Sequence, residues 1–416
     1  MSNARRALLT STFSGMFLWG VIASIAPLGK SWPFVPDTGL FRILLILVGP
    51  LFELIGSFVM GFLSDFVGRK KIFIVTVALY SIGLMLISLS FSVIELMIGI
   101  ALSDFGAAGE EIPTISILAE DSEKDSRASI VTNGMNFSNV GSAFIAGVFL
   151  LISLSQSTLI IQRLIIGVMS AVLIALIIYS RTRMPESFRW LGTRGRNEES
   201  ASEREKLGIG ETSGDSVQNV GSYSLRYFVL GSMALSQYLT FGLMIYIIPY
   251  YEFSSARTID ILVFFGLIGA SIAGPIGARL LSFGRKSYSV FSFAGGLISV
   301  LVILLLTNQL TDLLVFVPLV FLNMFFSEFA WAARTTLEPE LFQTAARGRG
   351  IAIVRLIPMI AYPATIVLFA NLNLFQEILS NVLLWSIGLA GVLTWFFLGK
   401  ETLGIELDFS SGEKSS

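Results

Sequence analysis

Carboxyl side chains interrupt long apolar stretches of this sequence, where an ionised group is costly to hold. Glu53 lies near the middle of the stretch 40–63, and Asp104 and Glu111 share one helical face of the stretch 94–118. A carboxyl group shielded from water can take up and release a proton as its surroundings change. Because the chain has no histidine, these three residues are the candidates for proton coupling. The alternative is a hydrogen bond or ion pair between helices without a coupling role.

Uncharged polar side chains in two other apolar stretches could bind a polar solute. Three asparagines recur every three residues within 130–153, a stripe that lipid would not tolerate and that we expect to line a central cavity. Glutamine and tyrosine side chains within 227–250 are expected to face this stripe. Amides and phenols suit the hydroxyl or amide groups of a ligand, and the rings can stack on a ring. The candidate binding residues are Asn133, Asn136, Asn139, Gln237, Tyr238 and Tyr246.

A further group of charges lies in the apolar stretches of the second half of the chain. Glu328 with Arg334 or Arg355 could form a structural ion pair. Either arginine, or Arg163 in the first half, would instead be the partner of an anionic substrate. The sequence does not rank these roles.

The composition excludes a soluble globule and indicates a membrane protein. The apolar stretches that hold these side chains are therefore expected to be helices that cross the membrane. Hydrophobic residues make up 54% of the 416 residues and charged residues 14%, and the mean hydropathy is +0.78. The absence of cysteine excludes disulfides, thiolate metal sites and cysteine nucleophiles. The net charge of −1 comes with no basic stripe for nucleic acid. No pattern indicates an enzyme, a metal site or a cofactor, and the lack of a G-x-x-x-x-G-K-[ST] phosphate loop argues against a primary pump.

Stretches of about 20 apolar residues predict twelve membrane-spanning helices. Six fall in each half of the chain, so the predicted fold class is an all-α membrane protein with twelve transmembrane helices in two six-helix halves. The expected spans are 8–28, 40–63, 72–91, 94–118, 130–153, 160–181, 227–250, 259–281, 288–308, 312–336, 350–370 and 378–399.

Polar stretches between the spans divide the chain and orient it. We expect a first six-helix half at 1–181, a cytoplasmic linker at 182–225, a second six-helix half at 226–400 and a cytoplasmic tail at 401–416. With both termini in the cytoplasm, most lysine and arginine residues fall on the cytoplasmic side, as the positive-inside rule requires. The prediction is a multi-pass protein of the cell membrane.

Several residues of the first half recur in the second half in the same order, each after an equivalent span. One position departs from the repeat, because Asp65 corresponds to Leu281. A carboxylate that holds a neighbouring helix end is therefore expected only in the first half. The repeated pairs are Gly61 and Gly277, Gly68 and Gly284, Arg69 and Arg285, Glu120 and Glu340, Arg127 and Arg347, and Glu186 and Glu401.

The turn G-F-L-S-D-F-V-G-R-K-K at 61–71 resembles the loop between helices 2 and 3 of the major facilitator superfamily. The segments 110–127, 185–196, 339–348 and 401–404 are similar to those of its sugar-porter group. The resemblance implies the major facilitator fold, a monomer, and charges at the cytoplasmic helix ends that hold an inner gate closed. It assigns gating to Gly61, Asp65, Gly68, Arg69, Glu120, Arg127, Glu186, Arg189, Arg285, Glu340 and Arg347.

The segment 236–249 resembles the sugar-binding signature in the seventh helix of that group. It retains Gln237, Tyr246 and Pro249. Ser236 and Gly242 replace a glutamine and an asparagine that hydrogen-bond sugar in the group. Relatives with a similar tenth-helix segment carry aromatic acids, other carboxylates or organic cations, so the resemblance leaves the substrate class open.

We therefore predict a secondary active transporter that moves a small polar organic solute, such as a sugar, by alternating access and proton symport. Its expected partners are this solute, the proton and the lipid bilayer, and not nucleic acid. One alternative is a transporter or exchanger of organic or aromatic acids. Another is a nutrient sensor of the same fold that binds its ligand without transporting it.

Overall fold

The computed structural model describes residues 2–29, 32–36, 40–155, 158–210, 221–369, 371–405 and 407. Within the predicted linker, positions 211–220 lie outside the described residues, and so do positions 406 and 408–416 of the predicted tail.

The described residues fold into helices joined by short loops. The long helices of the first half are α1 (Asn3–Gly29), α2 (Leu40–Val67), α3 (Arg69–Leu89), α4 (Val93–Glu120), α5 (Arg127–Ser155) and α6 (Leu159–Arg183). Those of the second half are α9 (Tyr223–Tyr246), α11 (Ala256–Leu280), α12 (Arg285–Leu305), α13 (Leu313–Leu341), α14 (Arg347–Leu368) and α15 (Leu374–Leu398). The short elements are α7 (Phe188–Thr193), α8 (Asn197–Leu207), α10 (Pro249–Glu252), η1 (Leu281–Phe283), η2 (Thr307–Gln309) and η3 (Thr344–Ala346). The predicted fold class is confirmed.

Ten of the described helices are long and apolar enough to cross a membrane. The two remaining long helices, α4 and α14, are interrupted by charges, and both contribute to the centre of the molecule. The charged residues of α4 are Glu95, Asp104, Glu110, Glu111 and Glu120. Those of α14 are Arg347, Arg349 and Arg355.

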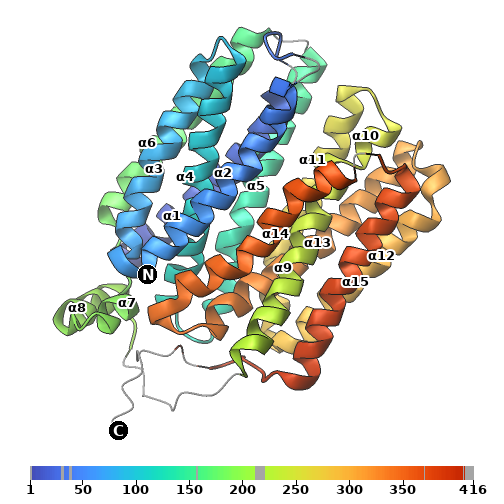
Figure 1. Ribbon diagram of the computed structural model, residues 1–416. Helices are drawn as coiled ribbons and strands as arrows, with labels where there is room; N and C mark the ends of the chain where they lie inside the picture. The colour runs from blue at the N-terminus through green and yellow to red at the C-terminus, as the bar shows by residue number, and fades with distance from the viewer. Residues whose placement is uncertain are drawn as a thin grey trace.

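The two halves stand side by side as two bundles (Figure 1). They meet mainly where α2 packs along α14 and α5 packs along α11. Large apolar side chains such as Leu151, Ile160 and Leu314 are exposed on the outside. A surface of this kind fits contact with lipid rather than with water.

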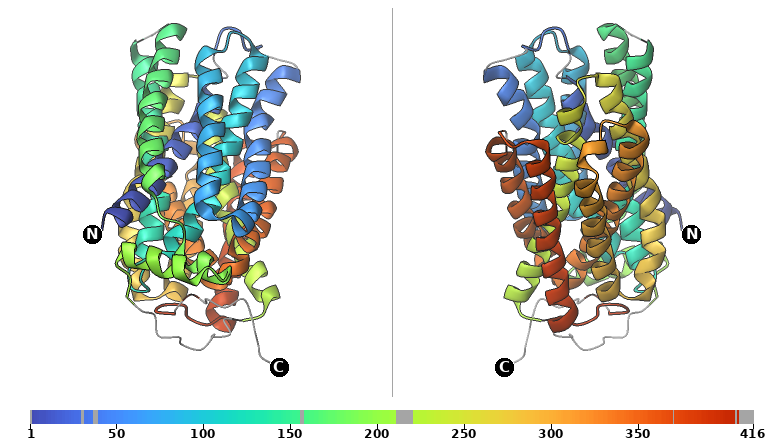
Figure 2. Two further views of the ribbon diagram at one scale, coloured as in Figure 1. Left: turned by 90° about the vertical axis from the view of Figure 1, so that its left-hand side faces the viewer. Right: turned by 90° about the vertical axis from the view of Figure 1, so that its right-hand side faces the viewer.

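One end of the molecule carries α7 and α8, and we call it the linker face (Figure 2). The turns from α2 to α3 and from α11 to α12 also lie there. Gly68 has a φ of 100° and Gly284 a φ of 135°, a conformation that glycine adopts without strain. Each glycine lets one helix end and the next begin at the following residue.

Two glycines let α1 and α5 approach closely. A β-carbon at Gly20 would lie 1.8 Å from the carbonyl oxygen of Ser138, and one at Gly141 would lie 1.9 Å from that of Phe17. Since these neighbours are backbone atoms, a side chain at either position would force the helices apart.

We expect Gly20→Ala to destabilise the protein by roughly 1–3 kcal/mol, the usual range for overpacking a tight contact. The thermal unfolding midpoint in detergent measures this loss. Gly167→Ala in α6 is the matched control, because its β-carbon would meet Ser88 Oγ at an ordinary 3.4 Å. Equal midpoints for the two variants would show that α1 and α5 do not need the close approach.

Candidate functional site

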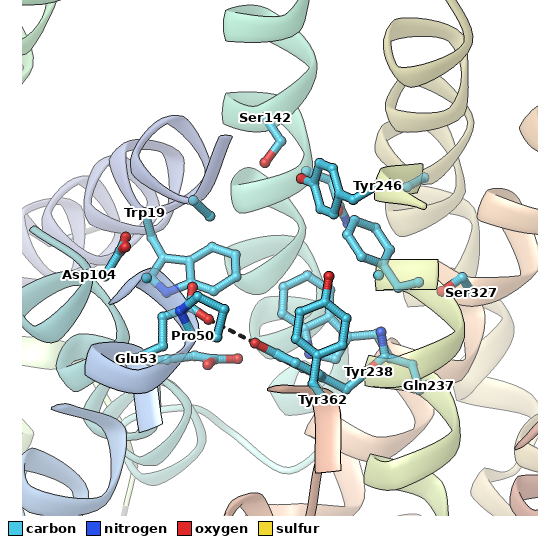
Figure 3. Close-up of a pocket in the computed structure, with 18 of the residues that line it drawn as sticks. Trp19, Pro50, Glu53, Asp104, Ser142, Gln237, Tyr238, Tyr246, Ser327 and Tyr362 are labelled. Carbon is cyan, nitrogen blue, oxygen red and sulfur yellow. Dashed lines mark hydrogen bonds between the residues drawn. The ribbon is translucent and has the colours of Figure 1, made fainter. Parts of the chain in front are cut away.

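A cavity of about 310 Å³ lies between the two halves (Figure 3). Its walls come from α1, α2, α4 and α5 of the first half and from α9, α11, α13 and α14 of the second. The lining residues are Trp19, Ala23, Leu45, Gly49, Pro50, Glu53, Asp104, Glu111, Asn139, Ser142, Gln237, Tyr238, Phe241, Gly242, Tyr246, Ile247, Ala270, Ser327, Glu328, Trp331, Arg334 and Tyr362.

The end of α9 shapes one side of this cavity. The helix stops at Tyr246, because Ile247 leaves the helical conformation with φ −127° and ψ −57°. Pro249 then begins the short helix α10. The predicted span 227–250 is therefore broken near its end, and the broken segment brings Tyr246 and Ile247 to the cavity wall.

All three predicted proton-coupling residues line the cavity. The Tyr238 hydroxyl of α9 donates to Glu53 Oε2 of α2 at 2.8 Å, which joins the two halves. Asp104 has no hydrogen-bond partner among the described residues, although only 3% of its surface is exposed. Glu111 forms an ion pair with Arg355. The carboxyl groups thus differ in their partners, and Glu111 is the one held by an arginine.

Only part of the predicted binding set reaches the cavity. Asn139 lines it with the three predicted residues of α9, whereas Asn133 and Asn136 do not. Asn136 donates to the Ser271 carbonyl oxygen at 2.8 Å and so ties α5 to α11. Asn133 donates to the Ser129 carbonyl oxygen of its own helix at 2.7 Å. A three-residue step falls short of a full turn of 3.6 residues, so the asparagine stripe rotates away from the cavity.

Arg334 and Arg355, whose roles the sequence does not rank, form a chain of charges with Glu338 beside the cavity. Arg334 pairs with Glu338 at 2.8 Å, and Glu338 pairs with Arg355 at 3.0 Å. Glu328 pairs with neither arginine and instead accepts from Asn139 Nδ2 at 2.6 Å. Of the two ion pairs that the sequence allowed for Glu328, neither is formed. The four-residue spacing of Arg334 and Glu338 is the signal that could have revealed their pair.

Tyr362 of α14 is a cavity residue that the sequence did not indicate. A β-carbon at Gly242 would lie 2.3 Å from the Tyr362 ring, so the glycine makes room for the phenol. The space beside Gly242 of α9 is thus occupied by an aromatic ring from the neighbouring helix α14.

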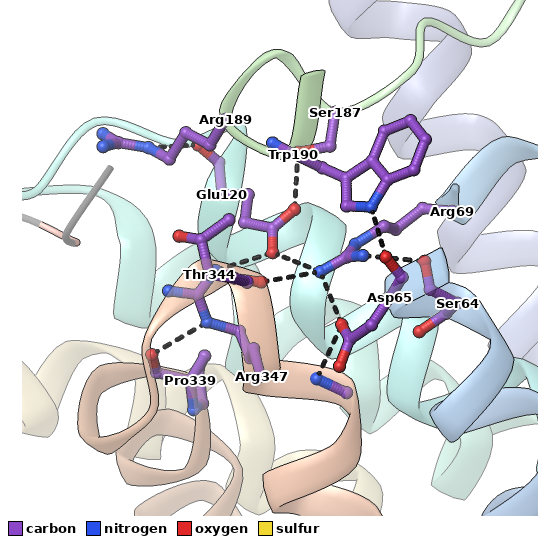
Figure 4. A network of polar contacts seen from close by, with 12 residues as sticks. Ser64, Asp65, Arg69, Glu120, Ser187, Arg189, Trp190, Pro339, Thr344 and Arg347 are labelled. Atoms are coloured by element: carbon purple, nitrogen blue, oxygen red, sulfur yellow. Dashed lines mark hydrogen bonds and ion pairs between the residues drawn. The ribbon is translucent and has the colours of Figure 1, made fainter. Parts of the chain in front are cut away.

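A second polar cluster joins the halves at the linker face (Figure 4). Glu120 pairs with Arg69 at 2.9 Å within the first half and with Arg347 of the second half at 2.6 Å. Ser187 Oγ donates to the other carboxylate oxygen of Glu120. Glu120, Arg69 and Arg347 are fully buried, so the cluster is closed to water.

Asp65 fastens the start of α14 across the same interface. Its carboxylate accepts from the Gly348 amide at 3.1 Å and from the Arg349 amide at 2.9 Å, and it pairs with Arg69 at 3.2 Å. The backbones meet closely here, since a β-carbon at Gly348 would lie 2.4 Å from the Gly61 carbonyl oxygen. A carboxylate at a helix start satisfies amides that have no partner inside the helix.

The repeat noted in the sequence is visible as two equivalent polar clusters, which we call cages. One consists of Arg69, Glu120 and Glu186, and the other of Arg285, Glu340 and Glu401. Glu186 accepts from the Arg69 amide at 2.9 Å, and Glu401 accepts from the Arg285 amide at 3.0 Å. Arg285 in turn pairs with Glu340 at 3.2 Å, as Arg69 does with Glu120. Burial raises the pKa of the Glu186 carboxyl, which lies in the loop between α6 and α7.

The two cages differ in how they reach the other half. Glu340 bonds within its own half to Arg285 and Thr402, and the position of Asp65 is taken by the buried Leu281. Arg127 donates to the Ile405 carbonyl oxygen at 2.8 Å. The structure thus shows the asymmetry expected from Leu281.

The remaining predicted gating residue, Arg189, also bridges distant segments. It donates to the Glu120 carbonyl oxygen at 2.7 Å and to the Leu407 carbonyl oxygen at 3.0 Å. The segment after α15 is thereby held against the first half at the linker face.

The family model of the Major Facilitator Superfamily matches residues 7–365. The chain belongs to the major facilitator superfamily. The predicted family is confirmed, and it places the chain among transporters rather than enzymes. No curated protein matches this sequence.

Solved structures show the same fold over nearly the whole chain. The proton:xylose symporter XylE bound to 6-bromo-6-deoxy-D-glucose has a TM-score of 0.79 at 15% identity, covering 97% of this chain and 98% of XylE. A partially occluded inward open conformation of the xylose transporter XylE from E. coli has a TM-score of 0.73 at 15% identity, covering 98% and 100%. A double Trp mutant of XylE has a TM-score of 0.74 at 17% identity, covering 96% of both chains.

Proposed function

We propose that this protein is a proton-coupled secondary active transporter that moves a small polar organic solute across the cell membrane by alternating access. The observation that carries the proposal is a cavity between the halves that is lined by carboxyl groups, while cross-half polar contacts close the linker face. In this family the solute site lies near the bilayer midplane between the repeats, which rock about it.

The polar cluster at the linker face acts as the inner gate in this proposal. The linker face is cytoplasmic, as the positive-inside rule requires, and the protein works as a monomer. Glu120 and Asp65 hold the second half through Arg347 and the start of α14. Opening this face requires those contacts to break, so the structure corresponds to a state closed toward the cytoplasm.

The contacts at the cavity favour a solute without negative charge over an anionic one. Arg163 donates to the Ser88 carbonyl oxygen at 2.8 Å and stacks on Phe91, and it does not line the cavity. Arg334 and Arg355 are paired with carboxylates. None of the arginines expected to hold an anionic substrate is therefore available without breaking an existing contact. The resemblance to XylE, a proton:xylose symporter by its description, supports proton coupling.

Spin labels at the linker face test alternating access directly. The chain has no cysteine, so Lys124→Cys and Phe283→Cys place one label on each half and no native cysteine has to be replaced first. We expect double electron–electron resonance to show two populations of the distance between the labels, and the longer one to grow when the pH or the solute concentration changes. Lys71→Cys with Lys124→Cys, both in the first half, is the control that stays constant. A single invariant distance in the first pair would contradict the proposal.

A further inference from the structure

The arginines beside the cavity are balanced by carboxylates. Arg355 pairs with Glu111 and, at 3.0 Å, with Glu338. Arg334 pairs with Glu338 at 2.8 Å. These two arginines and two glutamates therefore form a neutral group, in which neither arginine is left to bind an anionic ligand.

Three other carboxyl groups at the cavity meet no cation among the described residues. Glu53 accepts from the Tyr238 hydroxyl at 2.8 Å, and Glu328 accepts from the Asn139 amide at 2.6 Å. Asp104 has no hydrogen-bond partner there and is only 3% exposed. Buried anions without counter-charges are strongly unfavourable, so this site needs positive charge from a proton or from a ligand.

Aromatic rings surround the same space. Their faces carry negative potential and attract cations, and their bulk contacts an apolar body. Rings from both halves take part, which places such a ligand at the interface that must rearrange. The ring pairs are Trp19 with Trp331 at 6.4 Å, Tyr238 with Tyr362 at 5.6 Å, and Phe241 with Tyr246 at 6.3 Å between centroids.

We propose that the cavity binds an organic cation, with its positive charge at Glu53, Asp104 and Glu328 and its apolar body among the rings. This inference rests on the proposed transport function and names the substrate class. A neutral sugar would leave the three carboxyl groups to be neutralised by protons alone. A carboxylate substrate would add a like charge at the same place.

The cation and protons then compete for the same carboxyl groups. A carboxyl group that holds a proton cannot hold the cation, so entry of one requires departure of the other. Coupling is then an exchange of cation for proton, opposite in direction to the symport expected from the sequence. Around Glu53 lie Asp104 and Glu111 of α4, Tyr238 and Tyr246 of α9, and Tyr362 of α14. Around Glu328 lie Asn139 of α5 and Tyr288 of α12.

Binding of permanently charged cations to the purified full-length protein tests the inference. The probes are benzyltrimethylammonium, tetraethylammonium and N-methylpyridinium, followed through the change in tryptophan fluorescence, to which Trp19 and Trp331 at the cavity contribute. We expect at least one cation to bind, and benzyltrimethylammonium to bind about tenfold more tightly than neopentylbenzene, its neutral isostere. Affinity is expected to rise between pH 6 and pH 8, with protons released on binding.

Variants separate the site from general effects of charge. Glu328→Gln is expected to weaken cation binding about tenfold. Glu377→Gln in α15 is the matched control, because Glu377 is also buried but does not line the cavity. Binding of D-xylose or benzoate without binding of any cation would overturn the inference, and so would affinities independent of pH. A cation that binds but is never exchanged across a membrane would leave the inference standing and overturn the transport function.

Discussion

Glu120→Gln is expected to abolish transport, because it removes the charge that joins the halves at the linker face. The carboxylate holds Arg69 at 2.9 Å and Arg347 at 2.6 Å, and all three side chains are fully buried. A glutamine keeps the shape but leaves buried guanidinium groups without their anion. Breaking a buried pair in this way costs about 3–5 kcal/mol.

This cost falls mainly on the state in which the linker face is closed. A shift of about 3 kcal/mol changes the ratio of two conformations more than a hundredfold. We therefore expect solute exchange in proteoliposomes to fall below about 1% of the wild-type rate. The distance between labels at Lys124→Cys and Phe283→Cys should move to its longer population.

Glu340→Gln is the matched control for this prediction. Glu340 occupies the equivalent position in the second half but bonds to Arg285 and Thr402 of its own half. The Glu340→Gln variant should lower thermal stability, and it should change the label distance much less than Glu120→Gln does. Wild-type exchange by the Glu120 variant, or equal distance changes in both variants, would show that Glu120 does not hold the gate.

The second large effect is expected from Glu53→Gln. Glutamine can still accept the 2.8 Å hydrogen bond from Tyr238, but it cannot bind and release a proton. Accumulation driven by a pH gradient should therefore disappear. Exchange at equal pH on both sides should continue at a lower affinity, because one of the three carboxyl groups proposed to hold the solute's charge is lost. For one proton per solute, a gradient of one pH unit can drive an accumulation ratio of about 10, and the variant should show a ratio of about 1.

Tyr238→Phe separates the proton from the hydrogen bond. It removes the hydroxyl donor and leaves the carboxyl group of Glu53 in place. Coupling should persist in this variant, with a changed solute affinity because Tyr238 lines the cavity. If Glu53→Gln still accumulates solute against its gradient, Glu53 is a structural residue and Asp104 becomes the main candidate.

Much of the fold could be predicted because each span is a long apolar stretch bounded by charge or glycine. The helix ends at Gly68 and Gly284 and the cages around Glu120 and Glu340 also follow from the internal repeat. The break in α9 after Tyr246 could not be predicted from hydropathy, because Ile247 and Ile248 are as apolar as the helix before them.

The site was predictable where a charge stood inside an apolar stretch. Glu53 and Asp104 lie at the cavity for that reason. Aromatic residues gave no such signal, since the sequence cannot distinguish a ring exposed on the outside of a long helix, such as Phe291, from Tyr362 at the cavity. Ion-pair partners also depended on packing, and so Glu328 meets Asn139 rather than an arginine.

Counterflow in proteoliposomes tests the central claim most directly. Vesicles containing the full chain are preloaded with unlabelled organic cations, pentoses, hexoses, aromatic acids or dicarboxylic acids, and entry of the labelled compound is followed with and without a pH gradient. The account predicts that at least one solute is exchanged and that its accumulation follows the pH gradient. A solute that binds tightly while none is exchanged at any pH would contradict it and favour a sensor that does not transport.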